Sequence, residues 1–341
     1  MKRHLVVFLG RLALKVVIVG VLLSLSWSNA SAQEEDMECE EHVLEMDNGG
    51  RQSCPGVTPS LGEKLHRSYI LCVPSKLKTD PEEVPLLVVF HGGTGSAIFI
   101  KSEMQWEERG STDEFITAYP NGCRIDERHI ICDGGSWNAQ VGLTSVAEVC
   151  QIDDKAFIQK VIEDIRKDYE IQPDKIFAFG HSLGGMLVYR LACDMADTFA
   201  AIGHTAATLA PVATDSDEEY SCNPKGVSLF HVHNLKDQQV PFEGGGTETV
   251  YASARKAIEF WASSNKCTLS IDGHDFGDDI CLQGDCQSDT SIELCLLEAG
   301  DENDPADTHS FDTYDKAFFN SIKNKNKRKN IRDAFVERFL E

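Results

Sequence analysis

The stretch from Lys175 to Gly185 constrains the fold of this chain more than any other. Residues 175–179 are mostly apolar and include two phenylalanines, which predicts a short buried strand, and residues 186–192 predict the helix that follows. Between them the sequence reads Gly-His-Ser-Leu-Gly, the G-x-S-x-G pattern of a nucleophile elbow. A serine on so sharp a strand-to-helix turn has strained backbone and needs small neighbours. The context therefore predicts Ser182 as a nucleophile.

The N-terminus has the three parts of a secretory signal peptide. Lys2 and Arg3 lie near the start, an apolar run covers residues 16–25, and Ala-Ser-Ala occupies residues 30–32. The run is shorter than the about 20 apolar residues of a membrane span, although an uncleaved anchor stays an alternative. We expect residues 1–32 to be removed and the protein to be secreted and extracellular, with no membrane contact after cleavage.

Cysteine usage points to the same compartment. The chain has 12 cysteines, none of them in residues 1–32, and no C-x-x-C or zinc-finger spacing. This predicts disulfides formed in an oxidising compartment, and no metal. Spacing leaves the connectivity open, with the short loops Cys123 to Cys132 and Cys281 to Cys286 as candidates.

The charge of the chain limits its partners. Residues 1–32 contain four cations and no acid, so their loss changes the formal net charge from −23 to −27. So acidic a surface repels phosphate backbones and anionic lipid, which argues against nucleic-acid and membrane partners. A neutral polymer or a small ester is compatible with it. The oligomeric state is left open.

Strands alternate with helices along most of the chain. Strands are predicted at residues 68–73, 86–90, 115–119, 199–202, 227–233 and 292–297, and helices at about 153–165 and 250–262. This order predicts an α/β fold, with a mostly parallel sheet covered by helices on both faces. We expect residues 63–322 to form one domain. Residues 33–62 are predicted to be an irregular segment attached by disulfides, and residues 323–341 a basic tail with a helix.

A glycine-rich loop follows the apolar strand 86–90 and reads His91-Gly-Gly-Thr-Gly95. Glycines let backbone N–H groups approach a substrate oxygen closely. In a hydrolase with an elbow, such a loop supplies one oxyanion-hole donor, and the residue after the nucleophile supplies the other. Gly93 and Leu183 are therefore the predicted donors. A plain glycine turn before a helix is the alternative.

Two further residues complete a candidate triad. Asp237 lies just past the strand 227–233, where it could orient a histidine, and Asp215 and Asp217 are its competitors. In this kind of site the histidine follows the acid in the chain, which leaves His274 and His309. Neighbouring acids would keep His274 protonated and a poor base, so His309 is preferred.

Several motifs together resemble a known family. They are His91-Gly-Gly, Trp137-Asn138, Asp153-Asp154, Gly180-His-Ser-Leu-Gly-Gly-Met186, Arg190-Leu-Ala-Cys193, Phe199-Ala-Ala-Ile202 and Asp237-x-x-Val-Pro-Phe242. From about residue 68 to residue 319 the chain is similar to the secreted α/β-hydrolases known as polyhydroxybutyrate depolymerases and feruloyl esterases. The family usually has His-x-Trp-Pro after the last strand, whereas here His309 is followed by Ser-Phe.

The resemblance implies an α/β-hydrolase fold with disulfide-rich loops, in which Cys193 pairs with Cys222. It implies a Ser-His-Asp triad that cleaves polymer-linked esters, either feruloyl or acetyl esters of polysaccharide or a polyester, without metal or organic cofactor. His91 and Trp137, from the family motifs, are the expected substrate-binding residues. An inactive binding protein on the same scaffold and a serine peptidase or thioesterase are the alternatives.

The end of the chain is basic. A run of cations between Lys323 and Arg332 precedes apolar residues at helical spacing from Ile331 to Leu340. We interpret this as a solvated run before a helix that docks on the domain. An electrostatic tether to an anionic polymer or partner is the alternative.

Overall fold

The structure is a computed structural model that describes most of the chain after residue 36. The described residues are 37–47, 54, 64–127, 129–139, 142, 145–209, 222–224, 226–246, 250–269, 281–287, 289–321 and 329–340. All of them belong to the unit Glu35–Glu341. The predicted signal peptide lies outside them, so its cleavage stays a prediction. No helix among the described residues combines the length and the hydropathy that a membrane span requires.

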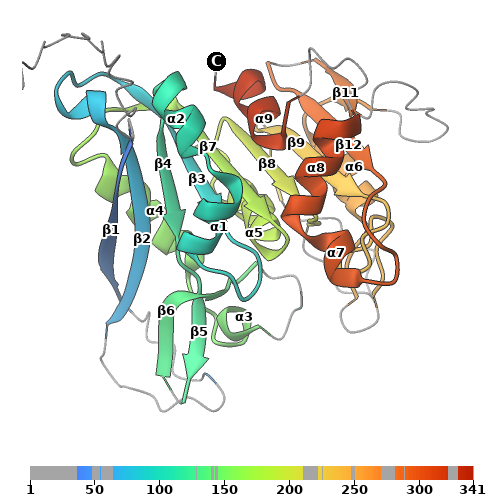
Figure 1. Ribbon diagram of the computed structural model, residues 1–341, viewed down its shortest axis with the longest axis horizontal. Coiled ribbons are helices and arrows are strands. Elements are labelled where there is room, and N and C mark those ends of the chain that lie inside the picture. The colour runs from blue at the N-terminus through green and yellow to red at the C-terminus, as the bar shows by residue number, and fades with distance from the viewer. Residues whose placement is uncertain are drawn as a thin grey trace, which may run out of the picture. The chain divides into compact units, whose positions relative to one another are not determined.

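One large sheet organises the described residues. Its strands are β1 (Met37–Met46), β2 (Leu65–Pro74), β3 (Val84–Phe90), β4 (Ile116–Pro120), β7 (Ile171–His181), β8 (Ala201–Thr205), β9 (Ser228–Asn234), β10 (Cys267–Thr268), β11 (Cys281–Cys286) and β12 (Ile292–Leu297). They are ordered β1-β2-β4-β3-β7-β8-β9-β12-β11-β10, and Figure 1 labels all of them except β10. The strands from β4 to β12 in this order run parallel, and antiparallel strands form both edges. Strands β5 (Cys123–Asp126) and β6 (His129–Ser136) form a separate hairpin.

Helices cover both faces of the sheet. One face packs on α4 (Asp154–Ile165), α5 (Leu183–Asp194) and α6 (Ala254–Ser264), and the other on α1 (Ala97–Met104), α8 (Phe311–Ser321) and α9 (Ile331–Phe339). Shorter helices are η1 (Ser75–Lys78), α2 (Glu107–Asp113), α3 (Val146–Val149) and α7 (Pro305–His309). In β3, Val88 faces the first core and Val89 the second, because successive side chains of a strand point to opposite faces. The predicted mostly parallel α/β architecture is confirmed.

Residues 37–46 of the N-terminal segment form a regular strand, which corrects the prediction that this part is irregular. Strand β1 pairs with β2 over ten residues, from Met37 opposite Pro74 to Met46 opposite Leu65. Its many acids are compatible with this because an edge strand needs only backbone pairing on one side, and charges protect such an edge. Disulfides do attach the segment, as predicted, through Cys39–Cys72 and Cys54–Cys150.

Six disulfides join all the cysteines. The remaining four are Cys123–Cys132, Cys193–Cys222, Cys267–Cys286 and Cys281–Cys295. The predictions for Cys123 and for Cys193 are confirmed. The prediction of a loop closed by Cys281 and Cys286 is wrong, since these residues are the two ends of strand β11.

The geometry of a strand explains this error. Six extended residues separate the terminal Cα atoms by about 16 Å at 3.3 Å per residue, whereas a disulfide tolerates about 7 Å. Each cysteine instead bonds across the ladder. Cys281 lies opposite Cys295 of β12, and Cys286 lies opposite Cys267 of β10.

The C-terminal helix α9 is part of the core. Phe335 is fully buried, with its ring centroid 5.4 Å from that of Phe179 and 5.9 Å from that of Trp106. A Cβ added at Gly203 would come within 2.6 Å of the Phe335 ring, so β8 must have glycine there. The predicted docking of an apolar helical face is confirmed. The basic residues 323–328 lie outside the described residues, and their role as a tether stays an alternative.

Candidate active site

The elbow has the backbone strain that the sequence predicts. Ser182 connects β7 to α5 and has a φ of 53°, in the left-handed region that side chains other than glycine rarely adopt. A Cβ at Gly180 would lie 2.5 Å from the backbone of Gly184, and a Cβ at Gly184 would lie 2.4 Å from the carbonyl oxygen of Phe90. Both glycines are therefore required for the close approach of β7, α5 and β3. The turn leaves Ser182 partly exposed at the end of the sheet.

Three side chains from distant parts of the chain form a continuous hydrogen-bonded line. His309 Nε2 lies 2.8 Å from Ser182 Oγ, and His309 Nδ1 lies 2.7 Å from Asp237 Oδ2. Asp237 follows β9, and His309 ends the short helix α7. The structure thus brings together the three residues that the sequence singled out. His274, Asp215 and Asp217 lie outside the described residues.

Asp237 is held as a carboxylate by four donors. Oδ1 accepts hydrogen bonds from the backbone N–H groups of Gln239 and Val240, both at 2.9 Å. Oδ2 accepts one from His309 and one from the hydroxyl of Tyr314, at 2.8 Å. Burial alone would raise the pKa of Asp237, but the bonds to His309 and the backbone hold it below its usual value. The group is therefore ionised at neutral pH.

Asn234 anchors the acidic loop that precedes His309. Its Nδ2 donates to the carbonyl oxygens of Thr308 at 2.8 Å and Ala299 at 3.0 Å, while Oδ1 accepts from the N–H of Ala299. The side chain is fully buried at the end of β9. Asn234 thus holds both ends of the loop 299–308. This places His309, the next residue, within hydrogen-bond distance of Ser182. Sequence analysis missed this role, because nothing local marks an asparagine at a strand end as a loop anchor.

The glycine loop His91–Gly95 lies directly against the elbow. A Cβ at Gly92 would be 3.4 Å from Ser182 Cβ, and one at Gly93 would be 3.8 Å from Leu183 Cδ2. Leu183 is the first residue of α5, so the positive end of the helix dipole lies at the same place. The loop and the helix end are thus positioned to offer backbone N–H groups to a developing oxyanion near Ser182 Oγ. The oxyanion role of Gly93 and Leu183 stays a proposal.

His91 and Trp137 hold the glycine loop in place. Both side chains are fully buried. His91 Nδ1 donates to the Gly92 carbonyl at 2.7 Å, Nε2 accepts from the Gly122 N–H at 2.9 Å, and Trp137 Nε1 donates to the His91 carbonyl at 2.8 Å. All these polar atoms are engaged inside the protein. We therefore assign the two residues to positioning the loop, and their predicted contact with substrate stays a prediction.

A buried ion pair lies next to Trp137. Arg67 donates to Asp154 Oδ1 at 2.8 Å, and both side chains are about 1% exposed. Asp154 Oδ2 accepts from the N–H of Asn138 at 2.7 Å, and the Arg67 guanidinium lies 3.9 Å from the centre of the Phe157 ring. The motifs around residues 138 and 154 are thus parts of one network, and its Arg67 lies 5.9 Å from the centre of the Trp137 ring. The sequence did not identify Arg67, because its partners lie 54 and 87 residues away.

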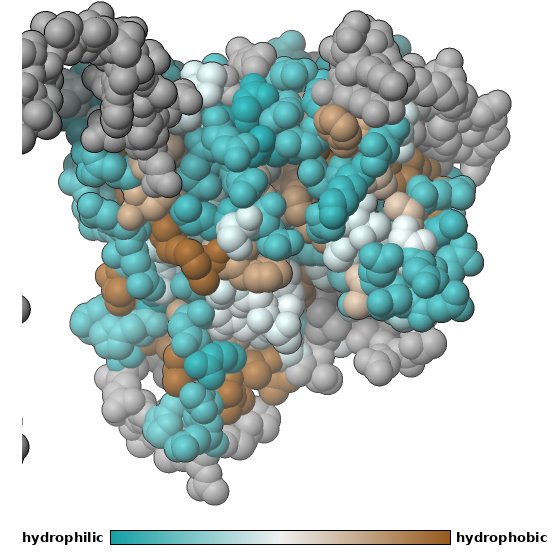
Figure 2. Space-filling view, viewed as in Figure 1, coloured by the Kyte–Doolittle hydropathy of each residue, from teal (hydrophilic) through white to brown (hydrophobic). Residues whose placement is uncertain are grey.

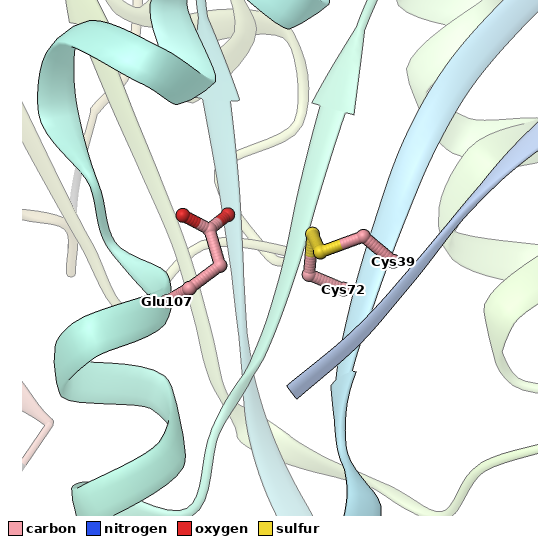
Figure 3. Close-up of side chains that lie close together, drawn as sticks. All are labelled: Cys39, Cys72 and Glu107. Atoms are coloured by element: carbon pink, nitrogen blue, oxygen red, sulfur yellow. A yellow bond between two sulfur atoms is a disulfide. The ribbon is translucent and has the colours of Figure 1, made fainter. Parts of the chain in front are cut away.

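Two groups of side chains resemble metal-binding clusters by distance. Among the described residues they are Cys39, Cys72 and Glu107, and Cys281, Glu293 and Cys295. The sulfurs of the first group are joined to each other, as Figure 3 shows, and those of the second are joined as well. A metal ligand must be a thiolate, so each group retains one carboxylate where a zinc site needs at least three protein ligands. Neither group can hold a metal while its disulfide is intact.

A chain of buried neutral histidines lies next to the triad residue Asp237. The hydroxyl oxygen of Tyr189 lies 3.0 Å from His231 Nδ1. His231 Nε2 lies 3.0 Å from His233 Nδ1, and His233 Nε2 lies 2.8 Å from the carbonyl oxygen of Val240. The final acceptor is a carbonyl, so a single direction of donation, from Tyr189 towards Val240, satisfies every pair. His204 packs against His231, and neither of its ring nitrogens has a partner among the described residues.

We expect the buried histidines of the chain and the buried His91 to make the stability of the folded state depend on pH. Burial lowers the pKa of His91 to about 4, that of His233 below its usual value, and those of His204 and His231 well below it. Unfolded histidines take up a proton below about pH 6.5. Unfolding therefore absorbs protons there, and the free energy of unfolding should fall by about 1.4 kcal/mol per histidine for each pH unit below 6.5.

Urea unfolding followed between pH 8 and pH 5 measures this effect. His204→Phe should reduce the slope of the free energy of unfolding against pH, below pH 6.5, by the equivalent of about one proton. The variant lacks one histidine that stays neutral when buried and takes up a proton on unfolding. His129→Asn is the matched control, since His129 is exposed, and it should leave the slope unchanged. A stability that is flat from pH 8 to pH 5 would contradict the prediction.

Comparisons with known proteins give relatives for the chain. No family model matches the sequence. It is 25% identical over 241 residues to feruloyl esterase B of Piromyces equi, and this match covers 69% of the chain and 42% of the relative. It is 23% identical over 159 residues to the bifunctional acetylxylan esterase/xylanase XynS20E of Neocallimastix patriciarum, covering 47% of the chain and 20% of the relative. The chain spans less than half the length of the first curated relatives that it matches.

Solved structures include the crystal structure of a thermostable esterase. It superposes with a TM-score of 0.49 at 14% identity, covering 90% of this chain and 64% of the other. The chain is thus similar in sequence to feruloyl and acetylxylan esterases, which confirms that part of the predicted resemblance. Its mostly parallel sheet with helices on both faces agrees with the α/β-hydrolase fold that the resemblance implies. The likeness to polyhydroxybutyrate depolymerases stays a prediction.

Proposed function

We propose that this protein is a secreted serine carboxylic-ester hydrolase that acts on esters linked to polysaccharide. The single observation that carries the proposal is the line Ser182–His309–Asp237, with bonds of 2.8 and 2.7 Å at the two nitrogens of one imidazole. Such a line activates a serine hydroxyl as a nucleophile. It lies on an elbow next to a glycine loop, where backbone donors can stabilise an oxyanion.

The proposed mechanism is two-step acyl transfer. His309 Nε2 accepts the proton of Ser182 Oγ as this oxygen attacks the ester carbonyl, and Asp237 stabilises the imidazolium that forms. The N–H groups of Gly93 and Leu183 bind the oxyanion. The imidazolium then protonates the leaving alcohol, and an acyl-enzyme remains. Water, deprotonated by His309, hydrolyses the acyl-enzyme and restores Ser182.

The substrate class rests on the relatives and on charge. Proteins named feruloyl esterase and acetylxylan esterase match the chain over a large part of its length. The acidic surface favours a neutral polysaccharide over anionic polymers. A polyester of the polyhydroxybutyrate type is the second candidate, from the motifs alone. Secretion is supported by the N-terminal pattern and by six disulfides, which persist in oxidising compartments.

Two exposed apolar residues favour an aromatic acyl group over acetyl. Ile98 is 64% exposed and Phe99 is 55% exposed, both in the first turn of α1. This helix begins at Ala97, directly after the glycine loop and its N-cap Ser96. Figure 2 shows hydrophobic side chains at the surface over α1. We propose that they contact the ring of a feruloyl group whose ester lies at Ser182.

Replacing Phe99 with serine should therefore weaken aromatic substrates selectively. We expect KM for methyl ferulate to rise about three- to tenfold, because part of a phenylalanine's burial energy is lost. The KM for p-nitrophenyl acetate should be unchanged. Val43→Ser on β1 is the matched control, since Val43 is 63% exposed and lies on the edge strand. Equal effects on both substrates would contradict the proposed contact.

A panel of four substrates tests the function itself. Methyl ferulate, p-nitrophenyl acetate, a polyester film and a peptide anilide are compared with one preparation of the protein. We expect turnover of methyl ferulate and p-nitrophenyl acetate. Turnover confined to the anilide would indicate a peptidase, and turnover confined to the film a polyester depolymerase. No turnover of any of the four would favour an inactive binding protein.

A further inference from the structure

Tyr314 shares an acceptor with the histidine of the triad. Its hydroxyl donates to Asp237 Oδ2 at 2.8 Å, the same oxygen that lies 2.7 Å from His309 Nδ1. Tyr314 belongs to α8 and is fully buried. The other two donors to Asp237 are backbone N–H groups on Oδ1, so Tyr314 is the second side chain that bonds the carboxylate.

Sharing one oxygen has an electrostatic consequence. A hydrogen bond from a hydroxyl to the carboxylate stabilises its negative charge and reduces the charge that Oδ2 presents to the imidazole. The imidazolium of His309 then gains less from Asp237 than it would from an unshared oxygen. Removing the hydroxyl therefore raises the proton affinity of both Asp237 and His309.

The other titratable groups around the pair do not replace this effect. His233 on β9 faces Asp237 and donates to the carbonyl of Val240, and His181 on β7 has its ring centroid 5.2 Å from that of His309. Burial lowers the pKa of both, so both are uncharged at neutral pH. Tyr314 is neutral as well, because burial and the charge of Asp237 raise its pKa well above the usual value.

We propose that Tyr314 is a positioning residue that sets the basicity of His309 by hydrogen bonding to the Oδ2 atom of Asp237. This inference rests on the proposed esterase function. The hydroxyl takes up part of the charge that Oδ2 would otherwise present to the imidazole. The residue acts through Asp237 and makes no bond to substrate.

Tyr314→Phe removes the hydroxyl and retains the ring. We expect the acidic limb of the pH profile of kcat/KM for methyl ferulate to move upward by about half a pH unit. On the plateau above that limb, kcat should fall about threefold while KM is unchanged, since the substrate contacts are intact. Titration of His309 by NMR in protein with labelled histidine should show the same upward shift of its pKa without any turnover.

Tyr69→Phe is the matched control. Tyr69 is also fully buried, and its hydroxyl donates to an aspartate, Asp164 Oδ2, at the same distance of 2.8 Å. Asp164 lies on α4 and has no bond to the triad in the described structure. Both variants should lose thermal stability, but Tyr69→Phe should leave the acidic limb and the His309 titration in place.

The outcomes separate this inference from the proposed function. If wild-type protein hydrolyses esters and Tyr314→Phe keeps the acidic limb and the His309 pKa of wild type, Tyr314 is only a packing residue and the inference is wrong. If wild type hydrolyses no ester, the proposed function fails. The NMR titration then still decides whether Tyr314 sets the proton affinity of His309. An upward shift supports the inference, and an unchanged titration overturns it.

Discussion

Ser182→Ala should remove nearly all ester hydrolysis, with a loss of kcat on the order of 10⁵- to 10⁶-fold. In the described part of the chain, the Ser182 hydroxyl is the nucleophile that lies within hydrogen-bond distance of His309 Nε2, and water bound in its place lacks its fixed position. The variant should fold normally, because alanine retains the Cβ that the strained turn already accommodates. Measured kcat/KM for methyl ferulate and thermal unfolding in parallel check both statements.

A covalent probe makes the assignment of this serine independent of turnover. A fluorophosphonate should label the wild-type protein once and Ser182→Ala not at all. Ser111→Ala, on α2, is the matched control and should be labelled like wild type. Labelling that persists in Ser182→Ala would mean that another serine is the nucleophile.

The second large effect concerns the histidine. His309→Ala should lower the esterase rate by several orders of magnitude, since no other group in the described structure accepts the Ser182 proton. His274→Ala should change the rate by no more than a few-fold. The two variants are compared by kcat/KM for methyl ferulate at pH 8.

The comparison decides between the two histidines that sequence order allows. His309 departs from the usual motif of the resembling family, because Ser310 and Phe311 follow it. In the structure Ser310 accepts from the N–H of Thr313 and so begins α8, while Phe311 is buried in the second core. The different residues thus connect α7 to α8 without displacing the imidazole. A large loss in His274→Ala together with a small one in His309→Ala would overturn the assignment.

The architecture was predictable where local pattern decides it. The strand 292–297 was predicted with the bounds that β12 has, and β7, α5 and β9 were located to within a few residues. Missed elements were those with weak local patterns, such as the acidic edge strand β1 and the cysteine-bearing strand β11. An edge strand is stabilised by its partner's backbone, and that partner is not visible in the local sequence.

The sequence by itself determined the elbow, because the G-x-S-x-G pattern, the apolar strand before it and the helix after it all lie within about twenty neighbouring residues. It also determined the chain order of Ser182, Asp237 and His309. Only the tertiary structure decided how these residues meet. Asn234 bonds to Thr308, which lies 74 residues away and precedes the catalytic histidine. Tyr314 bonds to Asp237, which lies 77 residues away. Periodicity and turn chemistry act over a few residues, whereas hydrogen bonds between distant segments depend on how the sheet and its helices close around them.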